Sequence, residues 1–154
     1  MTAFATLDHA GIEALVPHRG PMCLLDRMLA WSPTRIECSA AGHRDPHHPL
    51  RSRSGLLASA TIEYAAQAAA VHGGLVAAAA GGNAPPGFLA SARDVRLASW
   101  RLDDLPPAEP DQLSIVAERQ AGDAGQLLYT FRVAHAGREI ASGRLAVVLG
   151  AEPA

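Results

Sequence analysis

One acidic side chain stands alone in a long apolar stretch of this sequence. The segment SGLLASATIEYAAQAAAVHGGLVAAAA, from Ser54 to Ala80, carries a single formal charge, Glu63, and the next charged residue is Arg93. A buried carboxylate is costly unless it is paired, protonated or functional. Desolvation favours the protonated carboxyl, which suits a general acid. Two interpretations stay open from the residues alone: Glu63 is a catalytic acid, or it is a structural carboxylate bonded to backbone N–H groups or to an arginine.

Gln67 follows Glu63 at a spacing of four residues, which places both side chains on one face of a helix. An amide at this place can orient the carboxyl or a water molecule. It can equally hydrogen-bond the backbone of a neighbouring strand. Both roles are consistent with the sequence.

Three histidines, His43, His47 and His48, lie in the polar loop GHRDPHHPLRSRSG that precedes the apolar segment. An imidazole that meets the carboxyl could act as a general base. The alternative is an exposed loop without a catalytic role. Adjacent histidines with only Asp45 as a further ligand lack a recognised metal spacing, so we expect no metal and no cofactor.

The elements that must position these side chains follow from periodicity. The Ala-rich segment predicts a buried helix from about Leu56 to His72, with Ser54 as N-cap and Gly73-Gly74 as a stop or a kink. We interpret His72 as a packing residue at the end of that helix, favoured there by the helix dipole. Ile12 to Val16 predicts a short helical turn. Alternating or β-rich runs predict strands at Met22–Trp31, Thr34–Ala40, Gly87–Leu102, Gln112–Arg119, Leu127–His135 and Arg138–Leu149.

This order of elements predicts an α+β fold. Two strands, one long buried helix and then about four antiparallel strands fit a sheet of five to six strands wrapped around a central helix. This is the hotdog fold, and we expect residues 1–154 to form one such domain.

Composition excludes several other classes of protein. Hydrophobic residues make up 49% and charged residues 18%, as in globular rather than disordered chains. The net charge of −2 gives no reason to expect nucleic-acid binding. The charge-free stretch is mostly Ala and Gly, so we expect no membrane span. Cys23 and Cys38 lack a metal-type spacing and predict buried thiols in a reducing compartment. The N-terminus lacks a signal-peptide pattern, and we therefore expect a cytoplasmic protein.

Three local motifs resemble one enzyme family. PHRGPMCLLDR (Pro17 to Arg27) is similar to the first motif of the FabA/FabZ-type 3-hydroxyacyl-[acyl-carrier-protein] dehydratases. IEYAAQAAA (Ile62 to Ala70) resembles their central-helix motif, and EPDQLSI (Glu109 to Ile115) resembles the start of a later strand. The three motifs occur in the family order and at a similar spacing. The I-E-Y-x-A-Q-A pattern is most similar to the hotdog dehydratase-like proteins of aryl-polyene biosynthesis.

The resemblance implies a reaction and assigns roles to residues. The reaction is the elimination of water from a 3-hydroxyacyl thioester on acyl carrier protein, with Glu63 as general acid and Gln67 beside it. The family spacing for the catalytic histidine falls on Pro49, so a one-residue insertion would bring His48 into register as the base, with His47 as the alternative. Backbone N–H groups at Gly55 and Leu56, near the helix N-terminus, would polarise the thioester carbonyl.

The resemblance also implies partners. The catalytic pair of the family faces across a dimer interface, so we expect a homodimer, or a heterodimer with another hotdog subunit. Acyl carrier protein is acidic and carries a phosphopantetheine phosphate, and Arg51 and Arg53 beside the loop are the candidate residues for binding it. Two alternatives remain: a non-catalytic hotdog subunit that partners an active dehydratase, and an acyl thioesterase.

Overall fold

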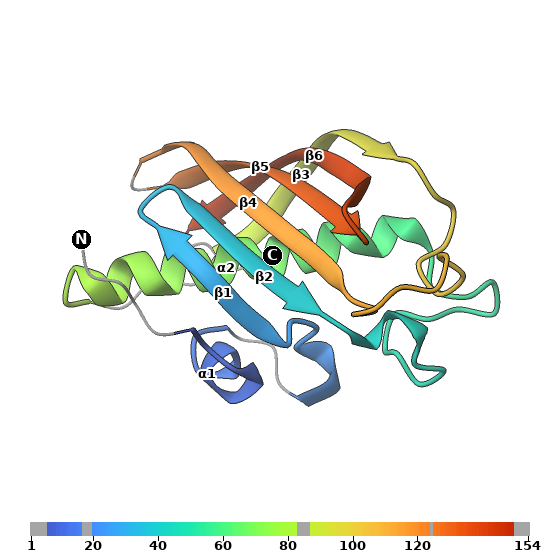
Figure 1. Cartoon of the computed structure of the whole chain (residues 1–154). Coiled ribbons are helices and arrows are strands. Elements are labelled where there is room, and N and C mark those ends of the chain that lie inside the picture. Colours follow the sequence, from blue (N-terminus) through green and yellow to red (C-terminus); the bar gives the residue numbers. More distant parts are fainter. Residues whose placement is uncertain (1–5, 17–19, 83–86, 124, 150–154) are drawn as a thin grey trace.

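A computed structural model describes residues 6–16, 20–82, 87–123 and 125–149 of the chain. A six-stranded antiparallel sheet curves around one long helix, α2 (Figure 1). The strand order is β1-β2-β4-β5-β6-β3. This arrangement confirms the predicted hotdog fold. The elements are α1 (His9–Glu13), β1 (Arg27–Ser32), β2 (Arg35–Ala40), α2 (Thr61–Ala79), β3 (Gly87–Leu97), β4 (Leu113–Gly122), β5 (Gln126–His135) and β6 (Arg138–Leu149).

The helix α2 lies further along the chain than predicted. It begins at Thr61 after a short 3-10 turn at Ala58–Ala60, and it has no side-chain N-cap, so Ser54 does not cap it. The residues before the turn pair with the segment after β3 in an isolated bridge: the Leu102 N–H donates to the Leu56 carbonyl, and the Ala58 N–H donates to the Trp100 carbonyl. Because these backbone groups pair with another segment, helical hydrogen bonds start only after them.

The glycine pair Gly73-Gly74 does not end the helix, which continues to Ala79. The surrounding residues are mostly alanines, which favour the helix on both sides of the pair. Gly74 also lies close to the N-terminal segment, because a Cβ there would come within 3.3 Å of the Leu15 side chain. The predicted stop was therefore wrong, and a small residue at position 74 serves close packing.

The first strand is shorter than predicted, because β1 begins at Arg27 and not at Met22. Gly20–Met22 forms a 3-10 turn, and the backbone groups of Met22 and Leu24 hydrogen-bond the Gln67 side chain in place of a neighbouring strand. This irregular segment packs against α2, so it becomes part of the candidate site. Residues 17–19, which include His18 of the first motif, and residues 83–86, between α2 and β3, lie outside the described residues.

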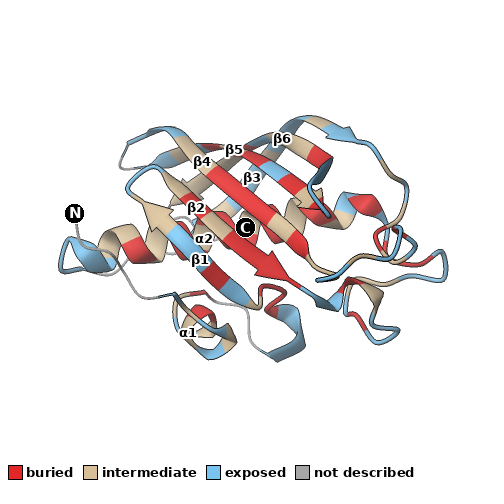
Figure 2. Ribbon diagram, in the orientation of Figure 1, coloured by how far each residue is buried: buried red, intermediate tan, exposed pale blue. Residues whose placement is uncertain are grey.

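The core lies between the concave face of the sheet and the helix (Figure 2). Tyr129, Phe131 and Val133 of β5 are buried, as the alternation in the sequence predicts, and they face buried residues of α2 such as Ala68 and Val71. Cys23 and Cys38 are both buried. Among the described residues, no helix combines the length and the apolar character needed to cross a bilayer.

Candidate active site

Glu63 and Gln67 form a hydrogen-bonded pair near the start of α2. The Gln67 Nε2 donates to the Glu63 Oε2 over 2.8 Å, one helical turn apart. Glu63 is partly exposed, whereas Gln67 is fully buried. The partly exposed Glu63 carboxyl group is therefore held by a hydrogen bond from a buried amide.

The orientation of the Gln67 amide is determined by the backbone of the segment before β1. Its oxygen accepts from the Leu24 N–H over 2.8 Å, and its nitrogen donates to the Met22 carbonyl over 2.8 Å as well as to Glu63. Because one neighbour is a donor and the other an acceptor, only one orientation of the amide satisfies both. Gln67 thus hydrogen-bonds both the segment before β1, which is not a strand, and the Glu63 carboxyl group.

His48 points into the core and not toward Glu63. Its Nε2 lies 2.9 Å from the Tyr64 hydroxyl, and its Nδ1 accepts from the Leu50 N–H over 3.1 Å. Since Nδ1 accepts, the neutral ring carries its proton on Nε2 and donates it to Tyr64. Successive residues of a helix point about 100° apart, so His48 contacts a different face of α2 from the one that carries Glu63.

Burial determines the protonation of this histidine–tyrosine pair. Desolvation is the largest effect on His48 and lowers its pKa, Arg51 lowers it further, and Asp45 opposes the shift. Desolvation also raises the pKa of Tyr64 well above its usual range, with a smaller contribution from Asp26. Both groups are thus neutral near neutral pH, which suits a hydrogen bond inside the core.

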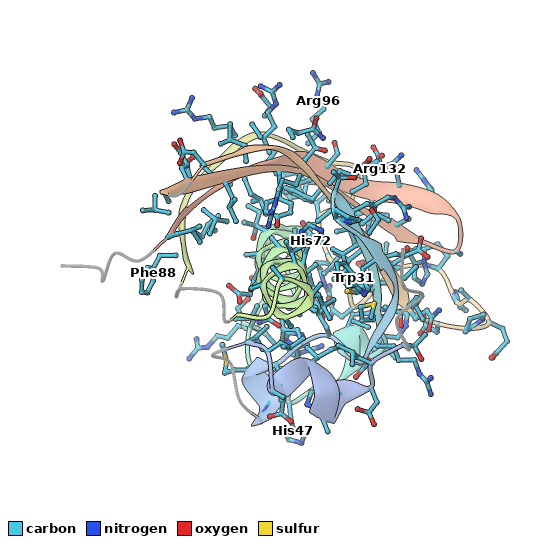
Figure 3. The ribbon with its side chains drawn as sticks, turned by 90° about the vertical axis from the view of Figure 1, so that its left-hand side faces the viewer. Trp31, His47, His72, Phe88, Arg96 and Arg132 are labelled. Atoms are coloured by element: carbon cyan, nitrogen blue, oxygen red, sulfur yellow. The ribbon has the colours of Figure 1, made fainter. Side chains whose placement is uncertain are left out.

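The other two histidines of the loop have different surroundings. His47 is exposed, its backbone N–H donates to the Asp45 carboxylate, and its side chain lies at the periphery of the molecule (Figure 3). His43 is fully buried beside Asp111 and His135. The structure therefore places the three histidines in three separate environments.

Asp103 connects the loop before α2 to the segment after β3. Its side chain is 4% exposed and accepts hydrogen bonds from Arg101 and from the Leu56 N–H, while Arg51 lies 3.1 Å from it. The hydrogen bond from Arg101 is the largest cause that holds the pKa of Asp103 well below its usual range. The Leu56 N–H predicted to polarise a thioester is thus already bonded to a carboxylate, and Arg51 is paired, whereas Arg53 is exposed.

His72 is a buried member of the core, and its predicted place at the end of the helix was wrong because α2 is longer than expected. Its Nδ1 lies 2.7 Å from the Tyr129 hydroxyl, and its Nε2 donates to the Ser32 carbonyl over 2.8 Å. Figure 3 shows His72 on the helix beside Trp31. Burial is the largest effect on this ring and lowers its pKa to about 4.

Two of the residues that shape the site were not anticipated from the sequence. Tyr64 lies inside the quoted helix motif, so its place was visible, but its contact with His48 was not. Asp103 lies in the polar run DDLPPAEPD, where nothing distinguishes it from its neighbour Asp104. Both roles depend on contacts between segments that are distant along the chain.

A model of one protein family matches residues 10–154, and its description is ApeP-like, ApeP dehydratase. The chain belongs to the ApeP-like dehydratase family. This membership agrees with the resemblance to the aryl-polyene dehydratase-like subgroup. Comparison with curated protein sequences found no match.

Solved structures with the same fold include dehydratases and thioesterases. The dehydratase heterocomplex ApeI:P from Xenorhabdus doucetiae matches with a TM-score of 0.79 and 22% identity over 92% of this chain and 91% of that one. A thioesterase from Pseudomonas aeruginosa matches with a TM-score of 0.56 and 14% identity over 80% and 79% of the two chains. A protein from Helicobacter felis described as an HP0420 homologue matches with a TM-score of 0.60 and 12% identity, over 91% and 88%. At these identities the matches show the fold alone.

Proposed function

We propose that this chain supplies the acid of a two-subunit dehydratase site that removes water from 3-hydroxyacyl thioesters on acyl carrier protein. The observation that carries the proposal is the Glu63–Gln67 pair, a partly exposed carboxyl group held by a buried amide near the start of the central helix. Membership of the ApeP-like dehydratase family supports dehydration as the reaction.

Glu63 would act on the leaving hydroxyl group. A base removes a proton from C2, the C2–C3 double bond forms, and the C3–O bond breaks. Glu63 gives a proton to the departing oxygen, so that water leaves. Gln67 donates to the Glu63 Oε2 over 2.8 Å and so orients the carboxyl group that transfers the proton.

The base would come from a second hotdog subunit. His48 has both ring nitrogens engaged, with Tyr64 and with the Leu50 N–H, so using it as a base would require breaking core contacts. His47 is exposed and remains the alternative base within this chain. A related hotdog structure is described as a heterocomplex, which supports a partner subunit as the source of the imidazole.

The open edge of the sheet is the proposed site for that partner. β3 is an edge strand of eleven residues, and most of its side chains are exposed. The opposite edge strand, β1, has six residues and forms a bridge with the N-terminal segment between Leu7 and Met28. Trp100, just after β3, is 90% exposed, and Leu97 is also exposed. A long free edge beside exposed apolar side chains is suited to strand pairing with another subunit.

Arg53 is the proposed first contact of acyl carrier protein. It is exposed, whereas its neighbour Arg51 is paired with Asp103. An exposed guanidinium can pair with the phosphopantetheine phosphate, and such a contact weakens as salt is added. This refines the expectation that Arg51 and Arg53 contribute equally.

The test compares Glu63→Gln with the wild-type chain. We expect Glu63→Gln to lower the turnover of a 3-hydroxyacyl carrier-protein substrate by about 100-fold or more, because glutamine is nearly isosteric but donates no acidic proton. The fold should persist, as judged by circular dichroism and thermal unfolding. The assay uses the chain alone and mixed with a hotdog dehydratase subunit that carries the histidine.

The product separates the remaining alternatives. Near-native formation of the 2-enoyl thioester by Glu63→Gln would show that Glu63 is structural. Release of free acid in place of the enoyl thioester would support a thioesterase. Full activity of the chain alone that is lost in His47→Gln would place the base in this chain, against the proposed partner.

A further inference from the structure

A second group of polar side chains lies at the end of the sheet where β2, β4 and β5 are paired. Ala40, Leu113 and His135 are register partners in one row across these strands. His43 follows β2 by three residues, and Asp111 precedes β4 by two. The strand pairing therefore brings His43, Asp111 and His135 together from three parts of the chain.

Both imidazoles approach the same carboxylate oxygen. The His135 Nε2 lies 2.8 Å from the Asp111 Oδ1, and the His43 Nε2 lies 3.3 Å from it. One potential ligand atom from each of the three residues falls within 4.8 Å of the others. Ligand atoms about 2.0–2.2 Å from a tetrahedral zinc ion are roughly 3.3 Å apart. The cluster could therefore surround a metal ion after a small movement of the His135 ring away from Oδ1.

The burial of the His43 side chain is not explained by hydrogen bonds. This side chain is fully buried, and within the described part of the chain its ring nitrogens make no hydrogen bond of good geometry: Nε2 only approaches the Asp111 Oδ1 at 3.3 Å. Burying a polar group that lacks a good hydrogen bond is unfavourable. A cation bound by Nε2 would compensate for this cost, because a neutral imidazole nitrogen is a good ligand for transition metals.

Arg44 orients the carboxylate of this cluster. Its Nε donates to Oδ2 of Asp111, its Nη2 makes a longer contact of 3.2 Å to Oδ1, and Nη1 donates to the Asp103 carbonyl. The strong contact on Oδ2 leaves Oδ1 facing the two histidines. The guanidinium charge also repels a dication, so the expected affinity is lower than that of the same ligands without an arginine.

We propose that His43, Asp111 and His135 bind a divalent transition-metal ion such as zinc. Two imidazole nitrogens and one carboxylate oxygen form a common ligand set for these ions, with water able to complete the coordination at the side where Asp111 is 33% exposed. The ion would tie the start of the loop that carries His47 and His48 to the ends of β4 and β5. Its role would be structural, and its detection does not depend on dehydratase activity.

The test measures metal binding by the whole chain without an affinity tag. After chelation and dialysis, we expect the wild-type chain to take up one zinc ion per chain, and cobalt(II) to give visible absorption bands typical of a tetrahedral nitrogen–oxygen site. Zinc should raise the thermal unfolding midpoint, because an ion that binds only the folded state stabilises it. Absence of both zinc uptake and the cobalt spectrum in the folded wild-type chain would overturn the proposal.

Variants locate the site. His43→Gln and His135→Gln should each weaken zinc binding by about tenfold or more and abolish its effect on thermal unfolding. His47→Gln is the matched control, because it removes an exposed histidine of the same loop that lies outside the cluster. Zinc binding that is unchanged in both cluster variants, or lost in the control, would place the ion elsewhere and overturn the assignment. If a cluster variant does not fold, the wild-type measurements decide.

Discussion

The Gln67 side chain links the catalytic proposal to the packing of the chain. Its amide oxygen accepts from the Leu24 N–H, and its amide nitrogen donates to the Met22 carbonyl and to the Glu63 carboxyl group. Such a network has one satisfied arrangement, and removing a donor leaves buried acceptors unpaired. The position of the Glu63 carboxyl therefore depends on a segment that lies more than forty residues before Gln67 in the sequence.

Gln67→Glu tests this positioning role. Glutamate keeps the acceptor for the Leu24 N–H but loses the donor to Met22 and faces the Glu63 carboxylate with like charge. We expect a loss of about 1–3 kcal/mol in the free energy of unfolding. We also expect the pH profile of kcat/KM to shift to higher pH, because a second carboxylate favours protonation of the pair. A loss of stability with an unshifted pH profile would show that Gln67 is only structural.

We expect the stability of the folded chain to decrease in acid, because His72 is buried. Burial lowers its pKa from 6.5 to about 4, and the groups packed around it are Tyr129, Trp31 and the positive Arg119. The unfolded chain binds the proton at higher pH than the folded chain does, so the stability is complete above pH 6.5 and falls as the pH drops toward 4. We expect His72→Gln to reduce this slope by up to about 1.4 kcal/mol per pH unit. Urea unfolding between pH 6.5 and 4 measures it, and equal slopes in both chains would contradict the assignment.

The entry into α2 is held by contacts with the segment after β3. Gly55 has a φ of +97°, and an added Cβ would lie 2.6 Å from the Arg101 Nε and 2.8 Å from the Asp103 carboxylate. The Leu56 N–H bonds the same carboxylate. These contacts restrict the conformation of the loop before α2. The ion pairs of Asp103 with Arg51 and Arg101 therefore help to position the first turn of the helix, which carries Glu63.

Two glycine substitutions should have opposite effects on stability. Gly55→Ala meets both the unfavourable backbone conformation and the close contacts, so we expect it to lower the free energy of unfolding by more than about 1 kcal/mol. Gly73→Ala is the matched control, since a Cβ at this position inside α2 meets nothing within 4 Å and alanine favours helix. We expect it to raise stability by about 0.5–1 kcal/mol. Chemical denaturation measures the free energy of unfolding of both variants. Equal changes in the two variants would contradict the steric restriction at Gly55.

At the scale of the whole molecule, the sheet is asymmetric in how its edges are protected. β1 is short and has α1 packed nearby, whereas β3 is long (Figure 1). β3 ends at the exposed Leu97, and the exposed Trp100 follows it. Long unprotected edges are rare in monomeric proteins because they pair with other chains. This asymmetry is the structural basis of the proposed assembly through β3.

Trp100→Ala should weaken subunit assembly without unfolding the chain. The side chain is 90% exposed in the single subunit, so its removal costs little folding energy, whereas a buried interface tryptophan often dominates binding. We expect the dissociation constant to rise by about tenfold or more, as measured by analytical ultracentrifugation. Leu128→Ala is the control, because Leu128 is 42% exposed on β5, away from the free edge. An unchanged dissociation constant in Trp100→Ala would remove this residue from the interface.

The sequence by itself determined the features that arise from local periodicity. The alternation of Tyr129, Phe131 and Val133 identified a buried strand face, and the spacing of Glu63 and Gln67 placed them on one helix face, because these patterns depend only on the geometry of one element. Only the tertiary structure decided where the helix begins, since that depends on pairing of Leu56 and Ala58 with the segment after β3.

The environments of the histidines were also decided by tertiary structure. His48 bonds Tyr64, sixteen residues away, and His72 bonds Tyr129, fifty-seven residues away. An imidazole can be a base, a metal ligand or a core hydrogen-bonding group with the same local sequence around it. Its role follows from which groups the folded chain places next to its two nitrogens, and those groups come from elements that only the tertiary fold brings together.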